Sequence, residues 1–300
     1  YAAPILADAK GYVWYSPTQF AQWGVSVPTT WDELMTLTQT IQQKTGSAPW
    51  CAGFSSGDAS GSPGTDWIED LVLRQSGADV YDQWVAGDVT FADAPIQQAF
   101  DTLGTILLDP SYVNAGFGDV TSIDSTAVAD VAAKIADGTC ALTHQASSLS
   151  SELLEVTDAD GETPTIAPDG DVYAFLLPGL EAGGDTYMEA DGEFVAAFSD
   201  SESVEEVLEY MTSPDFADAR VALGGVISAN RTADASLASS ELLTEAMETL
   251  QDPNTVVRFD ASDLMPAAVG SGSFPKGMVD WIDGTSTADV LAQIQAGYEG

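Results

Sequence analysis

The sequence predicts an α/β fold, because short apolar runs alternate with longer segments of helical periodicity along its 300 residues. The apolar runs are rich in β-branched and aromatic residues, which is typical of buried strands. With 45% hydrophobic and 9% aromatic residues, the chain can build the core of one large domain or two medium-sized ones. No apolar stretch approaches the roughly 20 residues that a membrane-spanning helix needs.

The first elements have recognisable start and stop signals. Gly11–Tyr15 predicts a buried strand, and residues 18–23 predict a short helix that ends at Gly24. A longer helix follows Thr30, which is a candidate N-cap, and Glu33 three residues later completes a capping box. The chain therefore opens with a strand, a short helix and a long helix.

The same alternation continues to the end of the chain, without an internal repeat or a low-complexity segment. We expect further strands at residues 49–54, 139–144, 173–177 and 194–198. We expect further helices that begin at Thr65, as an N-cap, and at residues 94–108, 127–136, 148–154, 202–211, 214–222, 236–250 and 287–297.

The charge of the chain argues against two classes of partner. The sequence has 47 Asp and Glu against 8 Lys and Arg, which gives a formal net charge of −39. Nucleic acids and anionic membrane surfaces both need a basic footprint that this chain lacks. The acidic residues are scattered along the whole sequence, so they predict a solvated surface that keeps the protein soluble, with adaptation to high salt as the alternative.

The two cysteines, Cys51 and Cys140, leave two interpretations open. Neither belongs to a CxxC motif, and His144 is the only histidine, so a zinc cluster is not expected. In a reducing compartment the two residues would be free thiols, whereas an oxidising compartment would permit a disulfide.

The chain carries no catalytic signature. It has no Walker A lysine motif and no G-x-G-x-x-G after a strand, and the G-x-S-x-G string at residues 53–57 leads into a loop rich in Gly and Ser rather than into a helix. Among so many acidic residues, pairs such as Asp66 and Glu69 arise by chance, so they do not indicate a glycosidase. We therefore expect no catalytic residues, no metal and no cofactor.

Two groups of motifs resemble a known family when they are taken together. The string VWYSP at residues 13–17 is followed by VPTTWDEL at residues 27–34. Near the C-terminus, RFDASDLMP at residues 258–266 is followed by VGSGSF at 269–274 and KGMVDW at 276–281. This combination resembles extracellular solute-binding protein family 1, the maltose/α-glucoside type that feeds sugar ABC importers. The resemblance covers nearly the whole chain.

The resemblance implies a periplasmic-binding-protein-like fold of type II, in which two α/β lobes are joined by crossings of the chain. The crossings are expected at residues 4–10, at residues 189–194 and just before Arg258. They divide the chain into a C-terminal lobe, residues 9–190 plus 258–300, and the remainder of an N-terminal lobe, residues 1–8 plus 191–257. We expect the second lobe to be complete and the first to be partial, because the family's opening segment of roughly a hundred residues has no counterpart here.

The resemblance also implies a disulfide between Cys51 and Cys140, since similar α-glucoside-binding proteins carry a pair at these places. It implies an extracellular, periplasmic or cell-surface lipoprotein location, with a signal segment that is absent from this sequence. The expected partners are a small-molecule solute, a sugar in the first place, and the membrane permease of an ABC importer. We expect the protein to be a monomer that binds no nucleic acid.

Ligand binding is expected between the lobes, where aromatic faces and polar side chains meet a sugar. The resemblance assigns this role to Ser62, Asp66, Trp67, Gln145, Ser148, Phe274 and Pro275, with Asp8, Asp191 and Glu193 near the crossings as further contributors. Relatives commonly carry aromatic residues where this chain has Ser62, Ser148 and Pro275. Three changes of this kind suggest a changed ligand, such as a smaller or non-carbohydrate solute.

The favoured function is capture of a maltose-like or other α-glucoside, or of a related small solute, by hinge closure without a covalent step. The alternative is an engineered or degenerate scaffold that keeps the fold and has altered or no sugar binding. A third possibility is an extracellular carbohydrate-active enzyme. Binding without turnover, turnover, or no response to a panel of solutes would distinguish the three.

Overall fold

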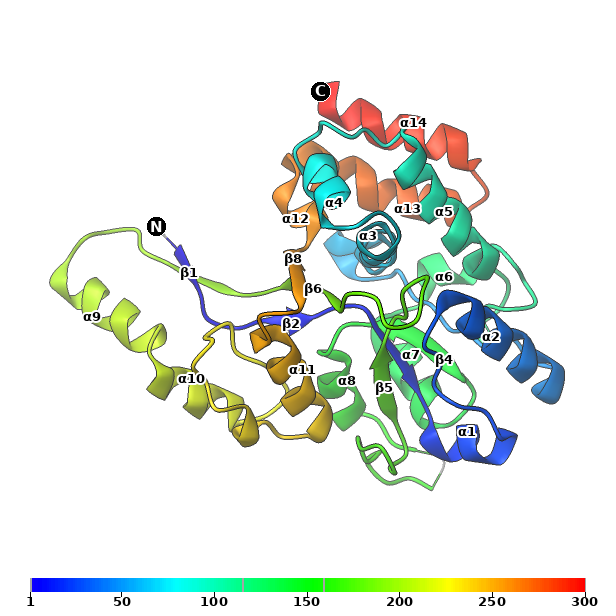
Figure 1. The fold of residues 1–300 in the computed structure, drawn as a ribbon, viewed down its shortest axis with the longest axis horizontal. Coiled ribbons are helices and arrows are strands. Elements are labelled where there is room, and N and C mark those ends of the chain that lie inside the picture. The colour runs from blue at the N-terminus through cyan, green and yellow to red at the C-terminus, as the bar shows by residue number, and fades with distance from the viewer. Residues whose placement is uncertain (1, 115, 159, 300) are drawn as a thin grey trace.

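A computed structural model describes residues 2–114, 116–158 and 160–299 (Figure 1). Tyr1 and Gly300, the outer limits of the two expected lobes, lie outside this part of the chain. Three small sheets organise the described residues, with strand orders β4-β3-β5, β2-β6-β8 and β1-β7. Helices surround the first two sheets, whereas β1-β7 and the helix that follows it extend away from the rest of the molecule (Figure 1).

The β4-β3-β5 sheet lies in the best-packed region. Its central strand β3 (Tyr12–Tyr15) is buried at all four positions and is antiparallel to β4 (Leu142–Gln145) and β5 (Tyr173–Leu176). A strand that is buried on both faces needs a continuous apolar run, which the sequence provides. The neighbouring helices are α1 (Pro17–Trp23), α2 (Trp31–Thr45), α7 (Val128–Ala136) and α8 (Leu149–Leu154) (Figure 1).

Helix α3 (Ser62–Ser76) is the central helix of this region and is buried along most of its length. It packs against α4 (Ala78–Val85), α5 (Ala94–Leu107) and α13 (Phe274–Ile282). Aromatic side chains hold these helices together in edge-on pairs, such as Trp84 with Phe274 and Phe100 with Trp281. Helix α14 (Thr287–Ala296) covers α13 and ends near the C-terminus (Figure 1).

The β2-β6-β8 sheet lies where three distant parts of the chain meet. Strand β2 (Asp8–Ala9) runs antiparallel to β6 (Tyr187–Asp191), and β8 (Val256–Phe259) runs parallel to it. On the far side of this sheet from α3 lie α10 (Pro214–Val221) and α11 (Glu241–Gln251) (Figure 1).

The extended arm consists of residues 2–4 and 194–223. Strand β1 (Ala2–Pro4) pairs with β7 (Phe194–Ala196) and leads to α9 (Glu202–Met211), in which no residue is fully buried. Shorter elements complete the described chain, namely α6 (Ser122–Ser125), α12 (Ala261–Leu264), 3₁₀ turns at Gly57–Ala59, Ala235–Leu237 and Gly297–Glu299, and a π turn at Val269–Ser273.

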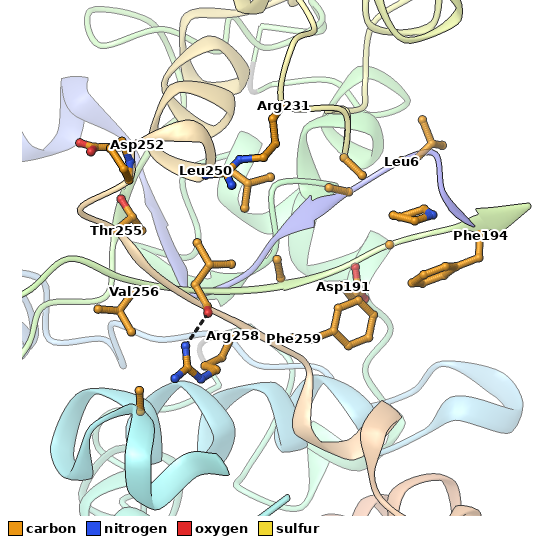
Figure 2. Close-up of a pocket in the computed structure, with 18 residues that line it drawn as sticks. Leu6, Asp191, Phe194, Arg231, Leu250, Asp252, Thr255, Val256, Arg258 and Phe259 are labelled. Carbon is orange, nitrogen blue, oxygen red and sulfur yellow. Dashed lines mark hydrogen bonds between the residues drawn. The ribbon is translucent and has the colours of Figure 1, made fainter. Parts of the chain in front are cut away.

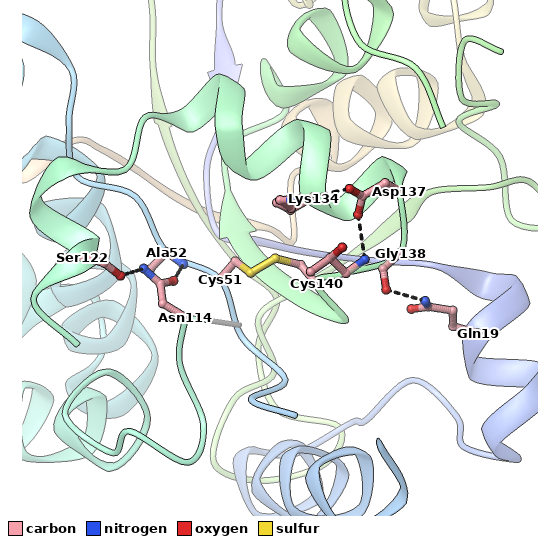
Figure 3. Close-up of a disulfide and its surroundings, with 10 residues drawn as sticks. Gln19, Cys51, Ala52, Asn114, Ser122, Lys134, Asp137, Gly138 and Cys140 are labelled. Atoms are coloured by element: carbon pink, nitrogen blue, oxygen red, sulfur yellow. Dashed lines mark hydrogen bonds and ion pairs between the residues drawn. A yellow bond between two sulfur atoms is a disulfide. The ribbon is translucent and has the colours of Figure 1, made fainter. Parts of the chain in front are cut away.

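The expected disulfide is confirmed: Cys51 and Cys140 are bonded, with their Cα atoms 5.8 Å apart (Figure 3). It joins the segment before η1, the 3₁₀ turn at Gly57–Ala59, to the chain that enters β4. Asn114 lies beside it, accepts a hydrogen bond from the Ala52 amide at 2.8 Å and donates one to Ser122 Oγ at 3.0 Å (Figure 3). The pair therefore crosslinks buried parts of one core.

Several local predictions need correction. Residues 49–54 form no strand, because Trp50 makes only isolated bridges to Val113 and Leu142. Helix α3 begins at Ser62 rather than after Thr65, since Gly61, with φ of 96°, turns the chain and Pro63 occupies the first turn.

Three further predictions are right in kind and differ in detail. Thr30 caps α2 through a bond from the Glu33 amide, and the Glu33 carboxylate accepts mainly from the Thr29 amide at 2.7 Å and only weakly from the Thr30 amide. The strand expected at residues 139–144 starts only at Leu142, and the helix expected at 236–250 starts only at Glu241. Among the residues that the structure describes, none of the helices combines the length and the apolar character needed to cross a membrane.

Candidate functional site

Charged side chains converge on the β2-β6-β8 sheet. Lys10, directly after β2, is only 7% exposed, and its ammonium lies between carboxylates of three segments. Its Nζ lies 2.5 Å from Asp260 Oδ2, 3.0 Å from Asp66 Oδ1 and 3.2 Å from Asp191 Oδ2. Asp260 follows β8, Asp66 lies on α3 and Asp191 ends β6, so one lysine ties all three strands to α3. We call Lys10, Asp66, Glu69, Glu189, Asp191 and Asp260 the junction cluster.

Burial and charge act against each other in the junction cluster. Burial lowers the pKa of Lys10, but the surrounding carboxylates outweigh it and hold that pKa well above the ordinary value. Burial raises the pKa of Asp66 to about 7 in spite of the nearby ammonium. Burial also acts to raise the pKa of Asp260. The charge of Lys10 and the hydrogen bonds from Ser262 and the Asp263 amide outweigh it and keep that pKa below the ordinary value.

A second buried ion pair lies deeper in the same region. Asp70 is fully buried, contacts the Arg74 guanidinium and lies 3.2 Å from His144 Nε2. Burial, followed by the charges of Arg74 and Lys10, keeps the pKa of His144 well below its usual range. The ring also stacks on Trp67 with centroids 4.2 Å apart. His144 is therefore a neutral, packed residue.

A polar hollow of about 260 Å³ opens beside the junction cluster. It is lined by Leu6, Ala7, Asp8, Ser148, Asp191, Gly192, Glu193, Gly225 and Val226. Four of the expected ligand-binding residues thus come together here from β2, the start of α8 and the end of β6. The Asp8 carboxylate accepts bonds from the Ser147 hydroxyl and, at 2.9 Å, from the Ser148 amide, which fixes the entry to α8. Burial raises the pKa of Asp8.

A larger hollow of about 730 Å³ lies along β6 and β8 (Figure 2). Its lining is mainly apolar and includes Leu6, Phe194, Leu250, Val256 and Phe259 (Figure 2). Its polar lining residues are Asp191, Arg231, Asp252, Thr255 and Arg258, and the Arg258 guanidinium already pairs with Asp82. The smaller hollow holds four of the expected ligand-binding residues and the larger hollow one, so we take the smaller hollow as the candidate site.

The remaining expected site residues are dispersed. Trp67 is 2% exposed and packs between Trp50 and His144, so its faces are occupied by the core. Phe274 and Pro275 are also buried, and Phe274 packs against Trp84 and Phe91.

Pro275 lies against Gly61, the residue that precedes Ser62. A Cβ atom at the neighbouring Gly61 would lie 2.1 Å from the Pro275 carbonyl oxygen, so only glycine permits this contact. Gln145 is half-buried, and its carbonyl oxygen accepts a bond from Trp14 Nε1 at 3.3 Å. Asp66 belongs to the junction cluster. It shares the Lys10 ammonium with Asp191, which lines the polar hollow.

Sequence reasoning missed four members of the junction cluster: Lys10, Glu69, Glu189 and Asp260. One signal was available, because Lys10 is among only 8 basic residues and is the last residue of an expected crossing. Oxygens of Asp66, Glu189 and Asp260 lie within 4.8 Å of one another, a spacing that would suit a cation. The Lys10 ammonium already contacts two of these carboxylates, so the protein itself supplies a positive charge there.

Comparison with known proteins shows the family. The family described as bacterial extracellular solute-binding protein matches residues 1–218, and the chain belongs to it. The osmoprotective compounds-binding protein GgtB of Synechocystis is 34% identical over 293 residues, which are 97% of this chain and 66% of that protein. The α-glucosides-binding periplasmic protein AglE of Rhizobium meliloti is 32% identical over all of this chain and 63% of its own length.

Solved structures show the same fold at low sequence identity. A chitin oligosaccharide binding protein superposes with a TM-score of 0.79 at 17% identity, over all of this chain and 71% of that one. The architecture is thus the type II solute-binding fold that the motifs implied. The chain spans about two thirds of the length of the curated relatives it matches.

Proposed function

We propose that this chain captures a small solute for an ABC importer, and that the solute is an α-glucoside or a related small polyhydroxylated compound. The polar hollow beside the β2-β6-β8 sheet carries the proposal, because it brings polar groups together from segments far apart in sequence. Its relatives are named for osmoprotective compounds and for α-glucosides. A membrane permease would receive the solute outside the cytoplasm.

The proposed mechanism is closure of two lobes about the junction cluster. The lobes would be residues 9–190 plus 258–300 and residues 1–8 plus 191–257, and β2, β6 and β8 would be the hinge strands. Ser148 approaches the hollow from the first of these units, whereas Glu193 and Gly225 approach it from the second. A solute that contacts both sides would shift the population towards the closed form.

The size and lining of the hollow favour a small ligand. A volume of about 260 Å³ lies just below the range of roughly 300–1,000 Å³ that is common for ligand pockets. The available groups are carboxylates, a hydroxyl and backbone amides, which pair with sugar hydroxyls. Each buried hydrogen bond to a charged group contributes about 1.5–3 kcal/mol, so a few correct contacts decide the specificity.

The test is calorimetry with maltose, trehalose, sucrose, raffinose and glycine betaine as probes, followed by product analysis. Saturable binding of one of the sugars without turnover supports the proposal. Glu193→Gln and Ser148→Ala should each weaken that binding by about 5- to 150-fold, since about 1–3 kcal/mol is lost. Glu206→Gln on the exposed face of α9 is the matched control and should leave binding unchanged. Turnover of a sugar would contradict the proposal.

A second candidate is a scaffold with altered or no sugar binding. No aromatic side chain lines the polar hollow within the described residues, and a sugar face usually stacks on one. Ser62, Ser148 and Pro275 stand where an aromatic residue was expected by resemblance. If all sugar probes fail to bind and glycine betaine alone binds, the ligand is a non-carbohydrate solute. If every probe fails, the scaffold is favoured.

A further inference from the structure

Glu189 is a buried acid without a donor. It lies in the middle of β6, is 0% exposed, and neither of its side-chain oxygens has a hydrogen-bond partner among the described residues. An ionised carboxylate in that position would lack both water and a compensating hydrogen bond, which costs several kcal/mol. The Glu189 carboxyl group must therefore be protonated, or it must share a proton with a neighbouring acid.

The two basic side chains near Glu189, Lys10 and Arg74, already bind other groups. The Lys10 ammonium contacts Asp66, Asp191 and Asp260. The Arg74 guanidinium contacts Asp70 and donates to the carbonyl oxygens of Leu177 at 2.6 Å and Tyr187 at 3.1 Å.

The neighbour that can form a hydrogen bond with Glu189 is Glu69 on α3. Its carboxyl group is also 0% exposed and lies in contact with that of Glu189. Glu69 accepts hydrogen bonds from the Ala261 amide at 2.6 Å and the Ser262 amide at 3.3 Å. These two bonds satisfy an ionised Glu69, whereas Glu189 has none. A protonated Glu189 can donate a hydrogen bond to the Glu69 carboxylate, which gives Glu189 a hydrogen-bond partner and Glu69 a further one.

We propose that Glu189 and Glu69 share one proton and that this carboxyl pair is a pH-sensitive clasp of the hinge. The pair ties β6 to α3, and Glu69 in turn holds the segment that follows β8. Its role in a hinge rests on the proposed function, whereas the shared proton does not depend on any solute.

The charged and titratable groups around the pair favour its protonation. Asp66 on α3 and Asp260 after β8 add negative charge, whereas Lys10 after β2 and Arg74 on α3 add positive charge. Tyr81 on α4 also faces the pair and is neutral at physiological pH. Burial first, and then the neighbouring acids, raise the pKa values of both glutamates well above their ordinary range. Like charges at close range act in the same direction in other carboxyl pairs.

The sign of the pH effect follows from these raised pKa values. The folded state holds a proton that the unfolded chain releases near pH 4.3. Stability is then fully present below that pH and is lost as the pH rises through the folded pKa. One extra proton in the folded state corresponds to a tenfold fall of the folding equilibrium constant per pH unit within this window. Above it, two buried carboxylates repel each other and the clasp opens.

The experiment compares the wild-type chain with Glu189→Gln and Glu206→Gln. A glutamine at 189 keeps the shape and donates an amide hydrogen to Glu69 without titrating. Infrared spectroscopy at neutral pH should show a protonated carboxyl band in the wild type and in Glu206→Gln, and this band should be weaker in Glu189→Gln, where Asp66 with its pKa of about 7 still contributes. As the pH rises, the folding equilibrium constants of the wild type and Glu206→Gln should fall faster than that of Glu189→Gln. The difference should be up to tenfold for each pH unit.

A second variant covers the case that Glu189→Gln does not fold. Glu69→Gln places the amide donor on the other side of the pair, and it should likewise weaken the carboxyl band and remove the steep pH dependence. A carboxyl band that is as strong in Glu189→Gln as in the wild type at neutral pH would overturn the proposal. Parallel pH profiles of wild type and glutamine variants would also overturn it. The proposal would also be overturned if added calcium raised the folding equilibrium constant of the wild type more than tenfold and a chelator reversed the change, because a cation would then neutralise the pair.

Discussion

The core around α3 and the arm formed by residues 2–4 and 194–223 use similar side chains with opposite results. Five tryptophans, Trp14, Trp50, Trp67, Trp84 and Trp281, are almost completely buried in the core region. In the arm, Phe198 is 98% exposed and Leu223 is 79% exposed. The β1-β7 pair and helix α9 of the arm extend away from the rest of the molecule, whereas the core region is enclosed by helices on several sides (Figure 1).

Helices α5 and α9 make the same comparison at the level of one element. Both are amphipathic, with apolar residues at helical spacing. Helix α5 buries six residues between α3, α13 and α14, whereas α9 buries none and leaves Val207 and Tyr210 more than half exposed. An apolar stripe therefore predicts a helix, but it contributes to stability only where a partner removes it from water.

The largest effect expected in the core region comes from removing its disulfide. Replacing both Cys51 and Cys140 by alanine should lower the free energy of unfolding by about 4–5 kcal/mol, because the bond closes a loop with a sequence separation of 89 residues. Urea unfolding of the wild type and the double variant measures the loss. Reducing agent should weaken the wild type alone. A loss below about 1 kcal/mol would show that the core holds these segments without the crosslink.

The next effect concerns the fully buried ion pair. Asp70→Ala should cost about 3–5 kcal/mol, since it leaves the Arg74 guanidinium buried without its carboxylate. Asp82→Ala is the matched control, because it breaks the Arg258–Asp82 pair at the surface and should cost about 0–1 kcal/mol. Equal losses in the two variants, measured by chemical unfolding, would contradict the distinction between buried and exposed pairs.

A smaller effect is expected from salt, which acts on core and arm together. With a formal net charge of −39, repulsion between surface carboxylates opposes folding at low ionic strength. The Debye length falls from about 10 Å at 0.1 M to about 3 Å at 1 M, so the melting temperature should rise by several degrees with sodium or potassium chloride. A flat response to both salts would show that the acidic groups are neutralised locally.

The smallest effect on stability is expected in the arm itself. Phe198→Ser and Leu223→Ser should each change the free energy of unfolding by no more than about 0.5 kcal/mol, because both side chains are already in water. Phe100→Ala on α5 is the contrasting variant and should cost about 3–5 kcal/mol.

The arm variants should instead alter association. Exposed apolar surface promotes contacts between molecules, so both serine variants should bind less of a hydrophobic dye and sediment more uniformly than the wild type. A loss of several kcal/mol in Phe198→Ser would mean that the arm folds back onto the core in solution.

The sequence determined the elements whose signals are local. The run Gly11–Tyr15 predicts β3 because a strand covered on both faces needs continuous apolar residues, and the structure confirms it. Periodicity and capping predicted α2, α5, α7 and α9 to within a residue or two at most ends. Motifs spread over most of the chain indicated the family and the fold, and with them the Cys51–Cys140 pair.

The tertiary structure alone decided what happens where distant segments meet. Strands β2 and β8 have two and four residues, too few to carry a periodicity, and they exist because they pair with β6. Lys10 and Asp260 are 250 positions apart, and no local pattern marks them as partners. Burial depends on which surfaces the fold brings together, so Trp67 became core and Glu189 became a buried acid. Local sequence fixes the conformation of a segment, whereas its neighbours fix the charge and the exposure of its side chains.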